Sequence, residues 1–276
     1  MSLNTRALLE LIRFHSPAGT LLLLLPCYWG AYVSTDNVSY VTLFWLAIGA
    51  FAMRSAGCIV NDIADRHIDA HVKRTQNRPL ARGALTLRHA SIMLLLLFMI
   101  AAFSALMLGV PVLLLGMAWL PLVVAYPFMK RVTFFPQAFL GVTFGAGALF
   151  GSMAVSNTIT TQAWWLYGAG FFWVLGYDTI YACQDKEDDM RIGVKSSALY
   201  FADRVVQAVS FCYLCSVICI LCAVGVPLNQ LSFFLLIIII LSFVTQICWL
   251  RNAHYMKAFK SNVFAGTLIL ALLIVR

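Results

Sequence analysis

Charged residues are scarce in this chain of 276 residues. Asp, Glu, Lys and Arg together make up 11% of it, whereas about a quarter is usual for a soluble domain. Apolar residues reach 62%, and the mean hydropathy is +0.88. This composition excludes an ordinary cytosolic enzyme, a disordered protein and a coiled coil. It suffices for roughly eight or nine membrane spans of about 20 residues each, so we expect a single integral membrane domain over residues 1–276.

Motifs of several familiar enzyme classes are absent. The chain has five histidines, and no Ser-His-Asp, Walker, Rossmann or zinc motif occurs in a credible context. The eight cysteines lie in or beside apolar stretches, and the spacing of Cys212, Cys215, Cys219 and Cys222 places these four on one helix face. We interpret that face as a helix–helix contact and not as a metal site, because no histidine or carboxylate lies at matching depth.

Nine apolar runs are long enough to cross a membrane as helices. Helix breakers at Gly109-Val-Pro111 and Gly225-Val-Pro227 separate two pairs of them. The predicted spans lie near residues 17–34, 41–61, 90–109, 111–128, 134–155, 163–183, 205–226, 230–250 and 262–275.

Basic residues occupy every second loop between these spans. The loop at 62–89 carries six Lys and Arg side chains, whereas the loops before and after it carry none. Basic residues return with Lys130 and Arg131, then at 186–204 and at 251–260. By the positive-inside rule, these loops and the N-terminus face the cytoplasm. The net charge of +8 therefore reflects topology, and we expect no nucleic-acid partner.

The acidic residues are few, and eight of the eleven fall in two runs. One run follows the predicted span at 41–61 and the other begins within the span at 163–183, so both reach the cytoplasmic side. Within each run, steps of four or seven residues bring side chains to one face of a helix. The first acidic stripe is Asn61, Asp65 and Asp69, and the second is Asp178, Asp185 and Asp189.

Two carboxylate stripes that face each other would repel strongly unless a cation lies between them. Hard oxygen ligands suit Mg²⁺, which commonly shares carboxylates with substrate phosphates. Nearby Lys and Arg side chains could bind phosphate oxygens, although each alone is also a topology signal. The pattern therefore predicts a Mg²⁺-bridged diphosphate. The basic residues are Lys73, Arg78, Arg82, Lys130, Arg131 and Lys195.

Arg54 lies inside an apolar span, seven residues before Asn61 and hence on nearly the same helix face. A charge within the membrane is costly and usually functional. We predict that Arg54 clamps a substrate carboxylate; a structural pair with a neighbouring helix is the alternative. Tyr177 and Tyr181 share the helix of the second stripe and could stabilise a carbocation through their rings, unless they serve as interfacial anchors.

The two stripes resemble the Asp-rich motifs of the UbiA prenyltransferase superfamily. They read Asn61-Asp-x-x-Asp65-x-x-x-Asp69 and Asp185-x-x-x-Asp189 here, and the resemblance extends over nearly the whole chain. Longer strings are most similar to the members that prenylate 4-hydroxybenzoate in ubiquinone biosynthesis. A departure is His15-Ser-Pro17, where the family often has an acidic–basic pair before the proline. The longer strings include Tyr126-Pro-Phe-Met-Lys-Arg131 and Ile192-Gly-Val-Lys-Ser-Ser.

The resemblance implies a fold and a reaction. The fold is an all-α polytopic membrane protein, with nine transmembrane helices around a central cavity and a cytoplasmic cap. The reaction is transfer of a polyprenyl group from polyprenyl diphosphate to the ring carbon ortho to the hydroxyl of 4-hydroxybenzoate, with Mg²⁺ as cofactor and release of diphosphate. The implied location is the bacterial inner membrane, with the N-terminus and active site cytoplasmic. Two alternatives remain: a prenyltransferase with another acceptor, such as homogentisate or a naphthoate, and a cation transporter.

The resemblance also implies roles for individual residues. Asp65, Asp69, Asp185 and Asp189 would hold Mg²⁺ and diphosphate, and Arg131 would be a further catalytic residue. The residues that would bind the two substrates are Arg54, Asn61, Asp62, Lys73, Arg78, Lys130, Asp178, Tyr181 and Lys195.

Overall fold

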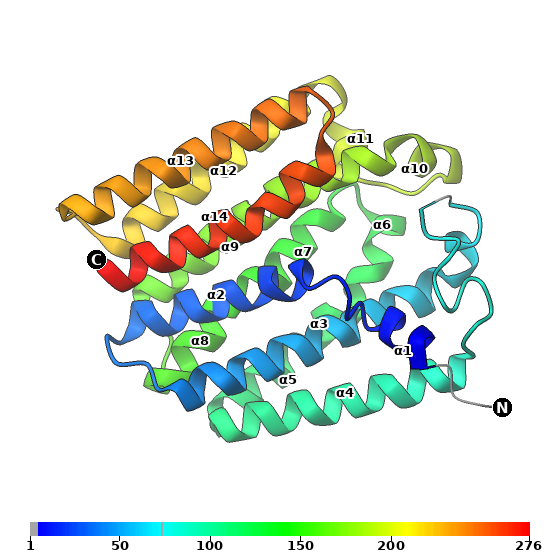
Figure 1. Ribbon diagram of the computed structural model, residues 1–276, viewed down its shortest axis with the longest axis horizontal. Helices are drawn as coiled ribbons and strands as arrows, with labels where there is room; N and C mark the ends of the chain where they lie inside the picture. The colour runs from blue at the N-terminus through cyan, green and yellow to red at the C-terminus, as the bar shows by residue number, and fades with distance from the viewer. Residues whose placement is uncertain (1–4, 73) are drawn as a thin grey trace.

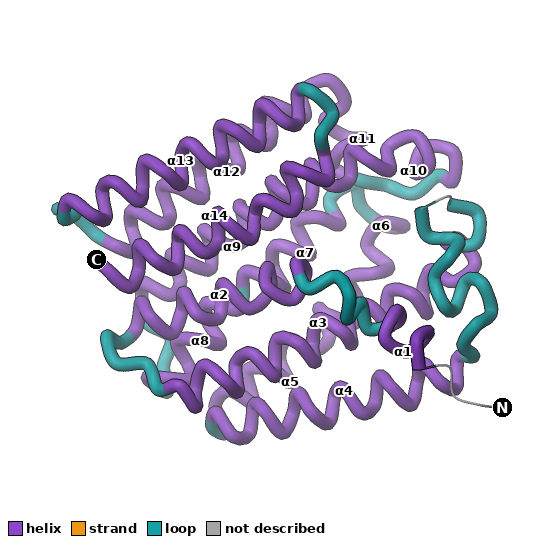
Figure 2. The backbone as a smooth tube through the Cα atoms, in the orientation of Figure 1, coloured by secondary structure: helices purple, strands orange, loops and turns teal. Residues whose placement is uncertain are grey.

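The computed structural model describes residues 5–72 and 74–276 of the protein. Over these residues the chain consists of helices and loops, without a β-strand (Figure 2). The α-helices in chain order are α1 (Thr5–Leu11), α2 (Ala18–Ser34), α3 (Tyr40–Asp69), α4 (Leu87–Leu108), α5 (Val110–Ala125), α6 (Met129–Val132), α7 (Pro136–Gly145), α8 (Gly147–Ser156), α9 (Thr161–Ala182), α10 (Lys186–Ile192), α11 (Ser197–Phe201), α12 (Val205–Val224), α13 (Gln230–Arg251) and α14 (Tyr255–Val275).

Helices occupy all nine predicted spans, and seven helical segments of the described chain are long and apolar enough to cross a membrane. The protein is therefore an integral membrane protein with seven candidate spans. Two predicted spans fall outside this set. The span at 17–34 is α2, an apolar helix of 17 residues, and the span at 163–183 is α9, whose tryptophans, tyrosines, glycines and Asp178 lower its hydropathy.

Local sequence explains where many of these helices begin and end. Ser39, Thr86, Thr160 and Asn229 each accept a hydrogen bond from a backbone N–H in the first turn of the following helix, which is the usual role of an N-cap. The predicted breaker Gly109 has a φ of 122° between α4 and α5, a conformation that glycine adopts without strain. The apolar runs are thus divided by short polar or glycine-containing junctions.

The long helices lie roughly side by side, with α12, α13 and α14 along one edge and α3, α4 and α5 along the other (Figure 1). Between these groups, α2 packs against α8, α14, α3 and α9, and α9 packs against α12 and α7. The loop at 70–86, α1 and α10 gather at one end of the molecule, whereas the C-terminus lies at the opposite end (Figure 1). This arrangement brings the ends of α3 and α9 that carry the acidic stripes to the same side.

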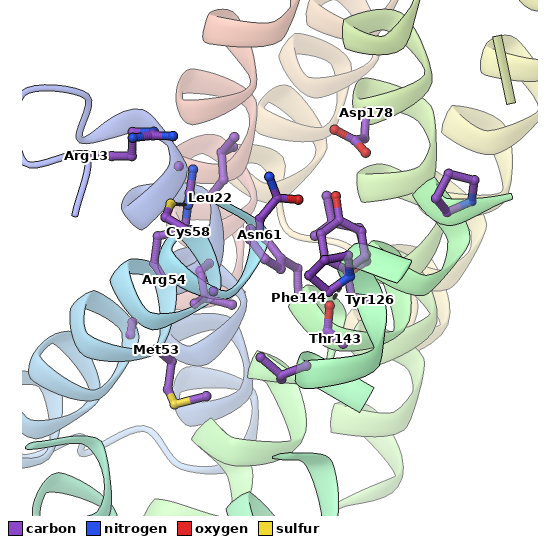
Figure 3. A pocket seen from close by; sticks show the side chains of 18 of the residues that line it. Arg13, Leu22, Met53, Arg54, Cys58, Asn61, Tyr126, Thr143, Phe144 and Asp178 are labelled. Atoms are coloured by element: carbon purple, nitrogen blue, oxygen red, sulfur yellow. Dashed lines mark hydrogen bonds between the residues drawn. The ribbon is translucent and has the colours of Figure 1, made fainter. Parts of the chain in front are cut away.

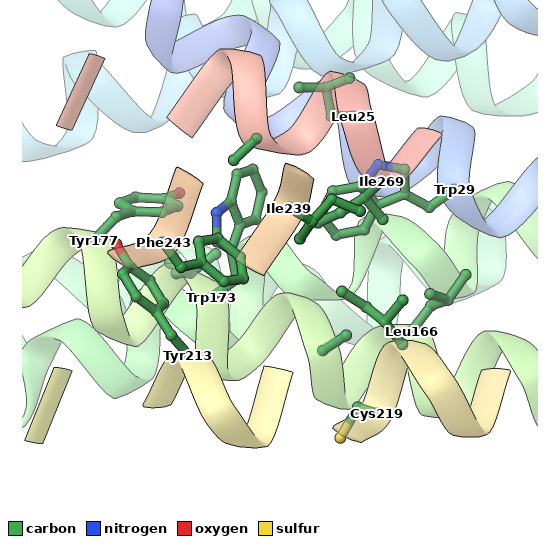
Figure 4. Close-up of a cluster of buried hydrophobic side chains, with 14 of the residues drawn as sticks. Leu25, Trp29, Leu166, Trp173, Tyr177, Tyr213, Cys219, Ile239, Phe243 and Ile269 are labelled. Atoms are coloured by element: carbon green, nitrogen blue, oxygen red, sulfur yellow. The ribbon is translucent and has the colours of Figure 1, made fainter. Parts of the chain in front are cut away.

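The largest hydrophobic core fills the space between α2, α9 and the three C-terminal helices (Figure 4). Trp29 and Trp173 contact each other at its centre with ring centroids 5.0 Å apart. The Trp29 indole donates to the Gly266 carbonyl at 2.9 Å, and the Trp173 indole donates to Asn262 Oδ1 at 2.8 Å. Both indoles need these partners because the hydrocarbon interior offers no water. They fix α2 and α9 against α14.

The predicted cysteine contact face is half buried in this core. Cys212 and Cys219 are buried and Cys222 is exposed, and all eight cysteines are free. A Cβ placed on Gly168 of α9 would lie 3.3 Å from the Cys219 sulfur. The cysteine face therefore packs directly on α9.

Helices α2 and α8 cross at very close range. A Cβ on Gly30 would overlap the Ala148 carbonyl, and a Cβ on Gly151 would overlap the Cys27 carbonyl. Small residues of this kind let helix backbones approach in membranes, where packing replaces the hydrophobic effect as the main attraction.

We predict that Gly151→Leu separates these helices and lowers the melting temperature of the detergent-solubilised protein. Overpacking typically costs about 1–3 kcal/mol, and contact with a rigid backbone carbonyl gives the side chain no room to adjust. The matched control is Gly116→Ala, because a Cβ there meets only Phe150 at an ordinary 3.8 Å. Equal melting temperatures for the two variants would contradict the close crossing.

Candidate active site

A cavity of about 770 Å³ opens between α2, α3, α4, α5, α7 and α9. Both acidic stripes line it, together with the loop at 70–86. Much of the remaining wall is apolar and comes from residues such as Leu46, Phe98, Leu120 and Phe144. The cavity thus joins a charged end to an apolar interior, which suits a ligand with a charged head and a hydrocarbon tail.

The carboxylates of α3 are buried and paired with basic side chains. Asp62 is 1% exposed and accepts from Arg13 Nη2 at 2.7 and 2.9 Å. Arg78 lies between Asp62, at 3.2 Å, and Asp69, at 2.8 Å. Asp65, also 1% exposed, pairs with Lys130 and contacts Arg131 Nη2 at 3.3 Å. Burial of these charges is tolerable only because each has such a partner.

Arg74 holds the outer part of the second stripe. It donates from Nε and Nη2 to the two oxygens of Asp185, at 2.8 and 2.6 Å, and from Nη1 to the Tyr181 hydroxyl at 2.8 Å. Burial disfavours the guanidinium charge, but the hydrogen bonds to Asp185 together with the nearby charges of Asp185 and Asp69 outweigh this cost and raise the pKa of Arg74. Arg74 therefore stays charged and connects the loop at 70–86 to α9 and α10.

Asp189 completes this end of the cavity. Burial raises its pKa to about 6, and the nearby Asp185 charge adds to the rise, whereas Lys130 and Arg74 oppose it. We refer to the α3 carboxylates, the outer carboxylates of the second stripe and their basic partners together as the outer charged cluster. It contains Asp62, Asp65, Asp69, Asp185 and Asp189 with Arg13, Arg74, Arg78 and Lys130.

The chemistry of the outer charged cluster fits Mg²⁺ together with a diphosphate. Its acidic members offer only hard carboxylate oxygens, which Mg²⁺ prefers. Within residues 5–72 and 74–276, no three His, Cys, Asp or Glu side chains converge closely enough to enclose a metal ion, because Lys and Arg occupy the space between most carboxylates. Metal binding would therefore require the carboxylates to exchange these partners, and the released Lys and Arg side chains suit phosphate oxygens.

A second group of polar side chains lies deeper in the cavity. Arg54 projects from α3, and its Nη1 donates a hydrogen bond to Cys58 Sγ. Asp178 projects from α9 on the other side (Figure 3). Asn61 and Tyr126 lie between them in this view (Figure 3). With Tyr177, which also lines the cavity, these residues form what we call the inner polar cluster: Arg54, Asn61, Tyr126, Tyr177 and Asp178.

Gly19 of α2 packs directly against Arg54. A Cβ at this position would lie 2.5 Å from Nε and 2.7 Å from Nη2 of the guanidinium, closer than real Cβ contacts. A glycine in the Pro17-Ala-Gly19 turn into α2 thus leaves the space in which the Arg54 side chain extends.

Most residues predicted from the sequence do meet at this cavity. Arg131 contacts Asp65 and the Ala64 carbonyl, but it is not among the cavity-lining residues. Arg82 pairs with Glu10 of α1, away from the cavity, and Lys73 lies outside the described residues. The predicted residues that line the cavity are Arg54, Asn61, Asp62, Asp65, Asp69, Arg78, Lys130, Asp178, Tyr181, Asp185, Asp189 and Lys195.

Sequence reasoning missed Arg13 and Arg74 as cavity residues. Both belong to cytoplasmic charge patterns that look alike along the chain, so charge alone could not select them. Arg13 has a φ of 58° just after α1, and this left-handed turn accompanies its approach to Asp62. No signal in a single sequence marks such a turn at an arginine, because the left-handed region favours glycine and asparagine.

Comparison with known proteins identifies the family. Residues 23–269 match the profile of the UbiA prenyltransferase family. The chain belongs to this family. It is 36% identical over 262 residues to the 4-hydroxybenzoate octaprenyltransferase of Actinobacillus pleuropneumoniae, covering 93% of this chain and 89% of that protein. It is 38% identical over 275 residues to the enzyme of the same name from Chromohalobacter salexigens, covering 95% and 90%.

Solved structures of UbiA homologues have the same fold. The apo structure of a UbiA homolog from Aeropyrum pernix K1 matches with a TM-score of 0.82 at 26% identity, over 93% of this chain and 97% of that one. A UbiA homolog from Archaeoglobus fulgidus bound to GPP and Mg²⁺ matches with a TM-score of 0.69 at 16% identity, over 96% and 99%. The second likeness bears on the fold alone.

We predict that Arg74→Ala weakens binding of inorganic diphosphate in the presence of Mg²⁺ by about tenfold or more, the usual size for a lost hydrogen bond between charged groups. Isothermal titration of the purified protein measures this affinity. Arg88→Ala is the control, since Arg88 is exposed at the start of α4 and does not line the cavity. Equal losses in the two variants would mean that Arg74 acts only through the general positive charge of the surface.

Proposed function

We propose that this UbiA-family protein transfers a polyprenyl group from polyprenyl diphosphate to the ring carbon ortho to the hydroxyl of 4-hydroxybenzoate, in ubiquinone biosynthesis. Residues 1–276 would act as one Mg²⁺-dependent prenyltransferase domain. The observation that carries the proposal is the cavity itself, in which buried carboxylates and basic side chains meet an apolar interior. The names of relatives at 36–42% identity support this choice of substrates.

The outer charged cluster is the proposed site for the diphosphate. Asp65, Asp69, Asp185 and Asp189 would hold Mg²⁺, with Asn61 and Asp62 beside them. When bound, Mg²⁺ would neutralise the diphosphate and make it a better leaving group.

Basic residues of the cluster would stabilise the negative charge that develops as the allylic C–O bond breaks. Arg78 and Lys130 now neutralise carboxylates and would turn to the phosphate oxygens once the carboxylates bind metal. Lys195, which donates to the Val132 carbonyl at 3.0 Å, is within the same wall. Arg131, which does not line the cavity, would act through its contact with Asp65.

The inner polar cluster is the proposed site for the aromatic acceptor. Arg54 would bind the acceptor carboxylate, because a fixed guanidinium deep in an apolar cavity favours an anion there. Rings of Tyr177 and Tyr181 line the same space and would face the allylic cation. The apolar part of the cavity would hold the isoprenoid tail.

We further propose nine membrane crossings around the cavity, with α2 and α9 added to the seven candidate spans. The loop at 70–86, α1 and α10 would form a cap on the cytoplasmic side, which the gathering of basic loops at one end supports (Figure 1). The proposed location is the bacterial inner membrane, with the N-terminus and active site cytoplasmic. Lipid would surround the apolar faces of α4, α5 and α13.

We expect the purified protein to convert 4-hydroxybenzoate and geranyl diphosphate to the prenylated acid when Mg²⁺ is present, as followed by mass spectrometry. Chelation by EDTA should abolish product, and Asp65→Asn should lower turnover by about 10²-fold or more, as for loss of a group that stabilises transition-state charge. Asp36→Asn, in an exposed loop away from the cavity, is the control.

Other outcomes would redirect the proposal. Turnover with homogentisate or a naphthoate in place of 4-hydroxybenzoate would keep the mechanism but change the acceptor. Folded protein that prenylates no acceptor, yet moves cations across vesicles in an Asp65-dependent manner, would instead establish a transporter.

A further inference from the structure

We propose that Asp178 is the base that receives the phenolic proton of the acceptor during transfer. The inference rests on the proposed function and adds a catalytic residue to it. It concerns the inner polar cluster, where Arg54 alone cannot distinguish 4-hydroxybenzoate from benzoate, since both carry the same carboxylate.

Asp178 differs from four of the other carboxylates that line the cavity; among the described residues it shares the lack of an ion-pair partner with Asp189, which belongs to the outer charged cluster. Asp62, Asp65, Asp69 and Asp185 are each engaged by Lys or Arg. In the part of the chain that the structure describes, no side chain forms a hydrogen bond or ion pair with Asp178, although it lines the cavity. Its carboxylate oxygens therefore remain free to bind a polar group of a ligand.

The place of Asp178 along α9 separates it from the diphosphate site. It lies seven residues before Asp185, which is roughly 10 Å along a helix axis. Arg54 precedes Asn61 on α3 by the same interval. The two residues thus face each other across the deeper part of the cavity (Figure 3), on opposite walls and away from the outer charged cluster.

A buried hydroxyl next to Asp178 also lacks a partner. Tyr177 is 1% exposed, and its hydroxyl has no hydrogen-bond partner among the described residues. Buried polar groups are nearly always satisfied in proteins, so the Tyr177 hydroxyl is a second unsatisfied polar group on the residue that precedes Asp178.

A para-substituted hydroxy acid matches this arrangement. With its carboxylate on Arg54, the ring directs its hydroxyl toward the opposite wall, where Asp178 accepts the O–H hydrogen bond. The ring carbon ortho to this hydroxyl is the nucleophile, and withdrawal of the phenolic proton raises electron density there. A carboxylate is suited to this task because it can both accept the hydrogen bond and take the proton.

Atoms, electrons and protons balance in the proposed reaction. A C–C bond forms between the allylic carbon and the ortho carbon, and the allylic C–O bond breaks with its electron pair on the diphosphate. The phenolic proton passes to Asp178, which leaves a cyclohexadienone. The hydrogen on the newly bonded ring carbon then leaves to water as a proton, and the ring oxygen recovers its proton from Asp178. One proton is released in total, and Asp178 returns to its starting state.

Three substitutions at this position separate hydrogen bonding from proton acceptance. Asn keeps an oxygen that accepts a hydrogen bond but cannot take a proton, Ala removes both capacities, and Glu keeps the carboxylate with a longer reach. Two measurements are made on each purified full-length variant. Equilibrium dialysis with labelled 4-hydroxybenzoate and benzoate, with Mg²⁺ and inorganic diphosphate present, gives the preference for the hydroxyl group. Product formation with geranyl diphosphate gives turnover.

We expect the unsubstituted protein to bind 4-hydroxybenzoate about tenfold or more tightly than benzoate, the usual worth of a charged hydrogen bond. Asp178→Asn should keep only part of this preference, because its amide oxygen accepts a neutral hydrogen bond, and its turnover should fall by roughly 10²- to 10⁴-fold, the usual contribution of a general base. Asp178→Ala should lose both, and Asp178→Glu should regain part of the turnover. Asp203→Asn, in an exposed turn before α12, should change neither.

Distinct results would overturn the inference. Turnover of Asp178→Asn within about tenfold of the unsubstituted protein would show that another group takes the proton. An unchanged hydroxyl preference in folded Asp178→Ala would show that Asp178 does not contact the hydroxyl of the acceptor. If Asp178→Asn does not fold, Asp178→Ala decides, because turnover within about tenfold of the unsubstituted protein would exclude a base at this position. Failure of the unsubstituted protein to prenylate 4-hydroxybenzoate would instead refute the proposed function, and the inference would fall with it.

Discussion

The structure depends on neutralising carboxylates that are buried in an otherwise apolar protein. An unpaired charge in such surroundings is expensive, and loss of one partner exposes the full cost of burying the other. Asp62, Asp65, Asp69 and Asp185 meet this constraint through Arg and Lys side chains from three different segments. These ion pairs therefore hold α1, the loop at 70–86 and α6 in place around the ends of α3 and α9.

Under the proposed function, the same constraint would ease the entry of a metal diphosphate. The carboxylates would exchange Lys and Arg for a divalent cation, and the basic side chains would exchange carboxylates for phosphate, so the net buried charge would change little. Arg74 illustrates the point, because its guanidinium presents to Asp185 the same paired donors that suit a phosphate. Deeper in the cavity, Asp178 has no such partner among the described residues.

Much of this arrangement could be predicted from the sequence, and the features that could not be predicted have physical reasons. Apolar runs located the helices, and steps of four and seven residues aligned Asp65 with Asp69 and Asp178 with Asp185, because these signals are local. The partners of the carboxylates were harder to predict from the sequence, because Arg13 reaches them through a left-handed turn and Arg74 through a folded loop. Nor did the apolar run at 134–155 reveal that it divides into α7 and α8 at Ala146.

Gly19 carries a consequence for how the family can vary. Its missing side chain provides the space occupied by the guanidinium of Arg54, from a helix that is distant in sequence. A methyl group at position 19 of a relative would displace a guanidinium at position 54 from this place. If Arg54 binds the acceptor as proposed, the two positions should vary together in relatives that differ in acceptor preference.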